Sequence, residues 1–314
     1  MVWGSFTPES AMARNPFSAS ANRRCWYAQR AAGYGSADPQ VLGGAAMAGS
    51  ARNARMSRGR INHIMRLGIV GGGRAAWAFG SAWLRIGWPI AGVWLREESH
   101  SHIAELLSTS RVDIGDLARD AELLLVAVSD RSIKAVVTSI PETEAIIFHA
   151  SGAMPSMRDG FSLHPLKTLP AVGEPSDLRD TLLVFEGNHR KTAKLIVKAM
   201  GARFAEITPE QKPLYHAAAV FGANYVAALL DIAQQIMAGA GVGDARTELA
   251  DLARSAIDNW VAHEDDTRFT GPAARGDLET IRRHLNALRD QPSLADLYEI
   301  LAEHIARQNL AAPK

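Results

Sequence analysis

Residues 66–86 read RLGIVGGGRAAWAFGSAWLRI, and this stretch decides the fold. Its first five residues predict a short buried strand, a triple-glycine turn follows at once, and residues 74–86 have helical spacing. Strand, glycine turn and helix in this order are the context that the dinucleotide-binding fingerprint G-x-G-x-x-G/A requires. The sequence therefore predicts that the ordered chain opens with a nucleotide-binding unit.

The fingerprint positions are Gly71, Gly73 and Ala76. Gly71 permits the tight turn, Gly73 lets the backbone approach a pyrophosphate, and Ala76 allows close packing of the helix on the strand. Free N–H groups at the helix start, beside Arg74, attract phosphate together with the helix dipole. A glycine turn that binds nothing is the alternative interpretation.

The end of the second predicted strand, residues 90–95, bears on the choice of cofactor. An NAD site usually has Asp or Glu there to accept from the ribose 2′-hydroxyl. This chain has Arg96, followed by Glu97 and Glu98. A cation suits a 2′-phosphate, so we expect NADP, with NAD as the alternative if Glu97 contacts the ribose.

The alternation of strands and helices continues to residue 207. Further strands are predicted at residues 122–128, 145–150, 181–186 and 203–207. This pattern predicts an α/β fold with a doubly wound, mostly parallel Rossmann sheet over residues 65–207. Ligands in such sheets bind beyond the carboxyl ends of the strands. There we expect Val128 and Ser129 to contact the cofactor, and Ser151 and Gly152 to contact the substrate.

Residues 208–314 predict an all-α domain for substrate binding and dimerisation. Residues 215–240 form a long, nearly all-apolar helix that Gly222 should interrupt and Gly239 should end. A helix that is apolar all round must be buried. The helices that follow could enclose it, and a second copy of the chain would serve as well. We expect a homodimer through this domain.

Three polar groups are candidates for chemistry. His164 lies in residues 162–168, predicted to connect two strands, and can exchange a proton near neutral pH. Lys212 and His216 are four residues apart and share a helical face, with Asn224 two turns further on. Such groups could protonate a substrate and orient it. The alternatives are a His164 bonded only to backbone, a solvated Lys212 and a structural His216.

Arg275, in residues 270–277, is a further candidate for substrate binding. Its guanidinium could clamp a carboxylate or phosphate. Thr270 and Asp277 are candidate helix N-caps, and capping alone would explain much of this segment.

Composition excludes several classes of protein. The 314 residues are 47% hydrophobic and 21% charged, enough for about two domains with buried cores. Without a basic excess in the body of the chain we expect no nucleic-acid partner, and without a long unbroken apolar run no membrane-spanning helix. No His-Glu-x-x-His or paired-cysteine pattern indicates a metal. Cys25 is the single cysteine, which fits a reducing compartment, and we expect a cytoplasmic protein.

Residues 1–64 differ from the rest of the chain. They contain eight arginines, no lysine and two acidic residues, a net charge of +6, without sustained periodicity. We interpret them as a disordered leader or a start assigned too far upstream, with Met56 and Met65 as alternative starts. An organelle transit peptide and a basic arm that contacts nucleic acid or anionic lipid are the other interpretations.

The ordered motifs GIVGGGRAAWAFG, AVSD, FHASGAM, SLHPLKTL, KPLYHAAAVFGANY and TGPAARGD resemble a family of predicted NADP-dependent oxidoreductases. In that family a Rossmann domain precedes a helical C-terminal domain of unknown function. The layout is more distantly similar to pyrroline-5-carboxylate reductase, ketopantoate reductase and the β-hydroxyacid dehydrogenases. In the last group a lysine and an asparagine one turn later assist hydride transfer. The resemblance places that lysine at Lys212, while His216 stands at the asparagine position.

These observations predict an NADP-dependent reductase or dehydrogenase. It would transfer a hydride between the cofactor and a small C=O or C=N substrate held between the domains, with Lys212, His216 or His164 supplying the proton. A catalytically silent dinucleotide-binding sensor or scaffold is the alternative.

Overall fold

The computed structural model describes residues 64–96, 102–264 and 266–310. Contacts divide the chain into two units, Met1–Arg58 and Gly59–Lys314, and the fold belongs to the second. The first unit lies outside the described residues, as does the rest of the predicted leader up to residue 63. The interpretations of residues 1–64 therefore stay predictions.

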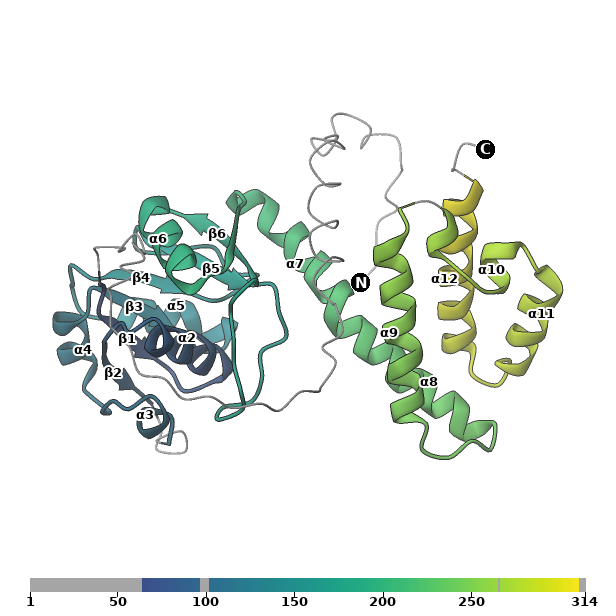
Figure 1. The fold of residues 1–314 in the computed structure, drawn as a ribbon, viewed down its shortest axis with the longest axis horizontal. Helices are drawn as coiled ribbons and strands as arrows, with labels where there is room; N and C mark the ends of the chain where they lie inside the picture. The colour runs from purple at the N-terminus through teal and green to yellow at the C-terminus, as the bar shows by residue number, and fades with distance from the viewer. Residues whose placement is uncertain (1–63, 97–101, 265, 311–314) are drawn as a thin grey trace, which may run out of the picture. The chain divides into compact units, whose positions relative to one another are not determined.

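A seven-stranded sheet forms the core of the Rossmann domain (Figure 1). Its order is β2-β1-β3-β4-β5-β6-β7, and every neighbouring pair is parallel except the antiparallel pair β5 and β6. The strands are β1 (Leu67–Val70), β2 (Ile90–Trp94), β3 (Leu123–Val126), β4 (Ile146–His149), β5 (Phe161–Pro165), β6 (Leu182–Gly187) and β7 (Arg203–Glu206). This confirms the predicted mostly parallel Rossmann sheet.

Helices pack on both faces of the sheet, which is why the central strands are uninterrupted apolar runs. The hydrophobic core on one face takes side chains from α2 (Arg74–Arg85), α3 (His102–Leu106) and α6 (Arg190–Met200). The core on the other face takes them from α4 (Ile114–Asp120) and α5 (Asp130–Ser139). Ala76, Phe79 and Trp83 recur at helical spacing on α2 and are fully buried, so this helix is fixed directly behind the glycine turn.

One strand was not predicted. Residues 162–168 were expected to connect strands, but Phe161–Pro165 form β5, which pairs with β4 on one side and β6 on the other. Phe161 and Leu163 alternate with Ser162 and are fully buried, a short period-2 pattern that precedes a proline. His164 therefore lies on a strand of the sheet and not in a loop.

The helical region begins after β7 with a turn of 3-10 helix, Pro209–Gln211, capped reciprocally by Thr208 and Gln211. Its α-helices are α7 (Lys212–Val220), α8 (Val226–Gly239), α9 (Arg246–Ala262), α10 (Pro272–Arg275), α11 (Leu278–Ala287) and α12 (Pro292–Leu310). A π-helical turn, Phe221–Tyr225, joins α7 to α8. The interruption expected at Gly222 is thus a widened turn inside one continuous helix.

The long apolar helix is not buried within the described part of this chain, contrary to expectation. Leu214 is 79% exposed and Phe221 68% exposed, and apolar side chains are also exposed on α9, where Trp260 is 60% exposed. By length and composition alone, Pro209–Gly239 is long and apolar enough to cross a membrane. The helices that follow do not cover this surface, and they also present exposed apolar residues.

Candidate active site

The glycine turn after β1 is shaped for close approach of another group. Gly71 has φ of +114°, and a Cβ there would lie 2.4 Å from the Ala127 carbonyl oxygen, so only glycine fits. Gly73 is the N-cap of α2 with φ of −87°, and a Cβ there would meet nothing within 4 Å among the described residues. The turn is therefore sterically closed toward β3 but open at Gly73, as the fingerprint predicts.

The start of α2 suits a phosphate. This twelve-residue helix has no acidic residue in its first turn, and Gly73 offers no side chain to cap its N–H groups. Ala76 is fully buried, so the helix packs closely, while Arg74 is exposed beside the open turn. Uncapped N–H groups and the positive end of the helix dipole bind anions. The residues present thus fit the pyrophosphate of a dinucleotide.

The other predicted cofactor residues lie at the same edge of the sheet. Val128 borders the turn, because a Cβ on Gly71 would come within 3.1 Å of its Cγ1 atom. Ser129 is the N-cap of α5, and its hydroxyl shares a 3.0 Å hydrogen bond with that of Ser132. Arg96 is exposed just beyond β2, whose Trp94 carbonyl accepts from the Gly71 N–H at 2.9 Å. Glu97 and Glu98, the alternative ribose contacts, lie outside the described residues.

Internal hydrogen bonds fix the loop after β4. The Ser151 hydroxyl accepts from the N–H groups of Ala153 (3.1 Å) and Met154 (3.0 Å). Burial lowers the pKa of His149 to about 4, so its ring is neutral at neutral pH. One ring nitrogen accepts from the Ser151 N–H at 3.2 Å, and the other donates to the Pro155 carbonyl at 3.1 Å. Ser151 therefore shapes the loop that presents Gly152.

Gly152 lies against two histidines. A Cβ there would sit 2.8 Å from Cδ2 of His216 and 3.0 Å from Cε1 of His164, so the missing side chain leaves room for both rings. The ring centroids of the two histidines are 6.3 Å apart. The structure thus brings together the end of β4, the end of β5 and the first turns of α7.

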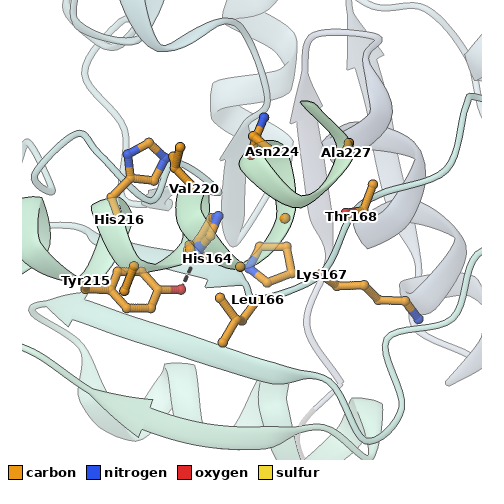
Figure 2. A pocket seen from close by; sticks show the side chains of 14 residues that line it. His164, Leu166, Lys167, Thr168, Tyr215, His216, Val220, Asn224 and Ala227 are labelled. Atoms are coloured by element: carbon orange, nitrogen blue, oxygen red, sulfur yellow. Dashed lines mark hydrogen bonds between the residues drawn. The ribbon is translucent and has the colours of Figure 1, made fainter. Parts of the chain in front are cut away.

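Tyr215 completes this cluster and was not among the predicted site residues. Its hydroxyl shares a 2.5 Å hydrogen bond with Nδ1 of His164 (Figure 2). Burial raises the pKa of Tyr215 to about 12, and burial, followed by the charges of His216 and Lys212, lowers the pKa of His164 to about 4. At neutral pH a protonated phenol therefore faces a neutral imidazole. The signal for Tyr215 was its position three residues after Lys212, on the helical face already singled out.

A cavity of about 750 Å³ opens beside this cluster. Asn224 reaches it from the π-helical turn, a form of helix that is often found at functional sites. Much of the remaining helical wall is alanine and glycine. The side chain of Lys167 extends away from the histidines (Figure 2), and its ammonium group donates to the Asp177 carbonyl at 2.6 Å. The lining residues are His164, Pro165, Leu166, Lys167, Thr168, Tyr215, His216, Ala218, Ala219, Val220, Gly222, Ala223, Asn224 and Ala227.

Four of the predicted catalytic and substrate-binding residues do not line this cavity: Ser151 and Gly152, in the loop after β4, and Lys212 and Arg275. Lys212 is 2% exposed, and its ammonium group is paired with Glu186 at 3.0 Å, away from the cavity. Arg275 is exposed on α10, where Asp277 caps the next helix by accepting from the Thr280 N–H at 3.0 Å. N-capping by Asp277 is as predicted, whereas the N-cap of α10 is Gly271 and not Thr270.

The described residues thus form a mostly parallel sheet with an open glycine turn, followed by a helical region whose first helix borders a cavity. Family models divide the chain in the same order. Residues 47–160 match a Rossmann-like domain, and residues 182–305 match a domain of unknown function, DUF2520. The second match begins at β6, before the boundary at residue 208 that the sequence predicts. Curated protein sequences yield no match to this chain.

Solved structures share the fold. A protein from Bacteroides fragilis with the provisional assignment of NADP oxidoreductase is 23% identical, with a TM-score of 0.66 over 78% of this chain and 98% of that one. A Thermotoga maritima protein is also 23% identical, with a TM-score of 0.64 and the same coverage. A reductive aminase from Aspergillus terreus, in complex with NADPH4, cyclohexanone and allyl amine, is 14% identical, with a TM-score of 0.56 over 78% and 93%. These structures confirm the arrangement of a Rossmann domain followed by a helical domain.

Proposed function

We propose that this protein is an NADP-dependent oxidoreductase that reduces, or forms by oxidation, a C=O or C=N bond in a small substrate. The observation that carries the proposal is that Gly152, in the loop after β4, faces His164 and His216 so closely that a Cβ there would clash with both rings, beside a cavity of about 750 Å³. The same edge of the sheet carries the open glycine turn, so a nucleotide bound at the turn has a polar site along its path.

NADP(H), when bound, supplies or accepts the hydride. Gly73 and the N–H groups of α2 hold its pyrophosphate. Tyr215 and His164 hold a proton at the substrate oxygen or nitrogen, because the phenol is protonated and the imidazole neutral at neutral pH. Asn224 orients the substrate from the π-helical turn. His216 closes the site against Gly152.

Binding of reduced cofactor is the first test. We expect Gly73→Asp to abolish the NADPH fluorescence change, because its carboxylate would occupy the phosphate position. Gly243→Asp is the matched control, since a Cβ there also meets nothing within 4 Å and Gly243 lies far along the chain. Equal NADPH binding by wild type and Gly73→Asp would remove the basis of the proposal.

Turnover separates an enzyme from a silent sensor. NADPH oxidation would be followed with cyclohexanone alone, a C=O probe, and with cyclohexanone plus allylamine, which supplies a C=N bond. A wider panel of carbonyl and imine compounds follows if neither is reduced. Cofactor binding without turnover across the panel would favour the sensor.

The preference for NADP over NAD rests on Arg96 and, beside the turn, Arg74. Both are exposed cations next to the predicted cofactor path, and neither is matched by an acidic residue in the first turn of α2. Arg96→Asp should weaken NADPH binding far more than NADH binding. If Arg96→Asp weakens the binding of NADPH and NADH equally, Arg96 does not determine the preference between the two cofactors.

We also propose that a second copy of the chain covers the apolar surface of α7 and α8. Leu214 and Phe221 are exposed on this helix, and Leu252 and Trp260 are exposed on α9; large exposed apolar surfaces mark interaction sites. Sedimentation equilibrium should give a dimer, and Phe221→Glu should shift it to monomer. A monomeric wild type, or one that floats with phospholipid vesicles, would contradict this proposal.

A further inference from the structure

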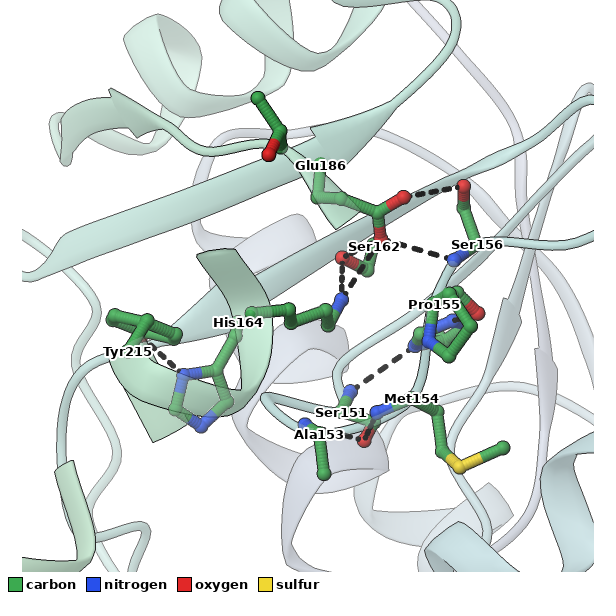
Figure 3. Close-up of polar contacts among 12 residues, drawn as sticks. Ser151, Ala153, Met154, Pro155, Ser156, Ser162, His164, Glu186 and Tyr215 are labelled. Carbon is green, nitrogen blue, oxygen red and sulfur yellow. Dashed lines mark hydrogen bonds and ion pairs between the residues drawn. The ribbon is translucent and has the colours of Figure 1, made fainter. Parts of the chain in front are cut away.

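A buried polar cluster lies beneath the candidate active site, outside the cavity. Lys212 and Glu186 are each 2% exposed, and the ammonium group donates to Oε2 of Glu186 at 3.0 Å and also to the Ser162 hydroxyl. Glu186 further accepts from the Ser156 N–H (3.0 Å), the Ser156 hydroxyl (2.9 Å) and the Ser162 hydroxyl (3.2 Å), as Figure 3 shows. One carboxylate on β6 therefore joins the loop after β4, strand β5 and helix α7.

Stability alone does not explain this cluster. Taking two charges out of water costs several kcal/mol each, and apolar side chains of similar volume usually stabilise a core as well or better. Hydrogen bonds from Lys212 and Ser156 nevertheless outweigh burial and hold the pKa of Glu186 below its ordinary value, so the carboxylate is kept ionised. A buried ion pair thus stands where apolar side chains could serve folding as well.

The ion pair has a fixed geometric relation to the site. Lys212 and Tyr215 are one helical turn apart, so they share a face of α7. Ser162 and His164 are two residues apart, so they share a face of β5. The Lys212–Ser162 and Tyr215–His164 hydrogen bonds are therefore two parallel links between the same helix and the same strand.

The loop is held by the same carboxylate. Ser156 binds Glu186 through both its N–H and its hydroxyl, four residues after Gly152, where a Cβ would clash with His216 and His164. Displacement of Glu186 would free the loop and the helix together.

We propose that Glu186 and Lys212 are positioning residues, whose buried ion pair sets the register of α7 on β5 so that Tyr215 and His216 meet His164 and Gly152. The purpose of this positioning rests on the proposed function, but the register of α7 on β5 can be tested without a substrate. In this assignment Lys212 acts through Tyr215 and His216, and its ammonium group does not contact the substrate.

The test is the titration of His164 in the full chain, followed by NMR of isotope-labelled histidine. The His164 signal is identified by its loss in His164→Gln. Groups that influence this ring are Tyr215, His216 and Lys212 on α7 and Asp130 on α5. In wild type we expect titration near pH 4, because the ring is buried against α7.

Glu186→Leu gives the sharpest result, because the loss of its charge and the release of α7 shift the pKa of His164 in opposite directions. Loss of a nearby carboxylate by itself would lower the pKa of His164 further, whereas release of α7 exposes the ring and raises the pKa toward 6.5. The double variant Glu186→Leu/Lys212→Met retains a neutral, filled core and should fold. We expect His164 to titrate well above pH 4 in both variants, and the single variant is the discriminating one, because loss of the Lys212 charge by itself also raises the pKa of His164 in the double variant.

The matched control is Glu206→Leu, which breaks an exposed helix-to-strand ion pair with Arg190 (2.5 Å) in the same sheet. It should leave the His164 titration unchanged. A double variant that melts as wild type does and whose His164 still titrates near pH 4 would overturn the proposal. NADPH binding by the same samples reports on the proposed function separately, because the glycine turn lies outside the altered cluster.

Discussion

Two glycines of one turn should respond in opposite ways to the same small substitution. Gly71→Ala places a methyl group 2.4 Å from the Ala127 carbonyl oxygen at a φ of +114°. Gly73→Ala places the same group where nothing lies within 4 Å, at a φ of −87° that alanine adopts readily. The first change strains the fold, whereas the second intrudes only on space that a cofactor would use.

The sizes follow from these contacts. A non-glycine residue in a sparsely populated backbone region costs about 1–3 kcal/mol, and the backbone clash moves Gly71→Ala to the upper end, about 3 kcal/mol. At about 2–4 °C per kcal/mol for a domain of this size, the melting temperature should fall by about 6–12 °C. Gly73→Ala should change the free energy of unfolding by less than about 1 kcal/mol, since only N-cap preference and chain entropy differ.

Differential scanning calorimetry measures the melting temperature of each variant, and NADPH fluorescence titration measures its affinity for the cofactor. We expect Gly73→Ala to melt as wild type does while its affinity for NADPH falls. If Gly71→Ala melts within a degree or two of wild type, the turn does not have the described conformation. If Gly73→Ala binds NADPH normally, the open side of the turn is not the phosphate site.

Three further outcomes are expected. Tyr215→Phe should lower kcat by about 100-fold or more with NADPH affinity unchanged, because the proton-bearing hydroxyl is lost; an unchanged kcat would exclude Tyr215 from proton transfer. Ala223→Phe should raise KM for whichever carbonyl or imine probe is turned over, by partly filling the cavity, whereas Ala228→Phe, one turn on and outside the lining, should not. The folded-state pKa of His149 is about 4, below its ordinary value of 6.5. Its contribution to the free energy of unfolding, at most about 3 kcal/mol, is therefore present above pH 6.5 and is lost as the pH falls toward 4. Urea unfolding between pH 4 and 7 should show a weaker pH dependence for His149→Gln than for wild type.

The Rossmann fold could be predicted because its signals are local. The strand at Leu67–Val70 and the helix from Arg74 are each written in a few consecutive residues, and the sterics of Gly71 and Gly73 match their predicted roles. Strand β5 escaped prediction because its four-residue alternation ends at a proline and resembles a loop. Its pairing with β6 depends on residues about twenty positions away.

The candidate site was predicted only in part, because it depends on contacts between distant segments. The sequence could place Lys212 and His216 on one helical face, but it could not show that the carboxylate facing Lys212 would be Glu186. That pairing turns a candidate proton donor into a buried ion pair and leaves Tyr215 to meet His164. The exposure of Arg275 likewise depends on where α10 packs.

The wide turn at Phe221–Tyr225 has a consequence for length variation in this chain. A π-helical turn is equivalent to one residue inserted into an α-helix, and an α-helix advances about 100° per residue. Deleting Ala223 would therefore restore a regular helix and leave the side chains of α8 at nearly the same angles around the axis, because the wide turn already absorbs the extra residue. A single lost codon would thereby remove the wide turn that brings Asn224 to the cavity, while α8 would keep the face that it presents now.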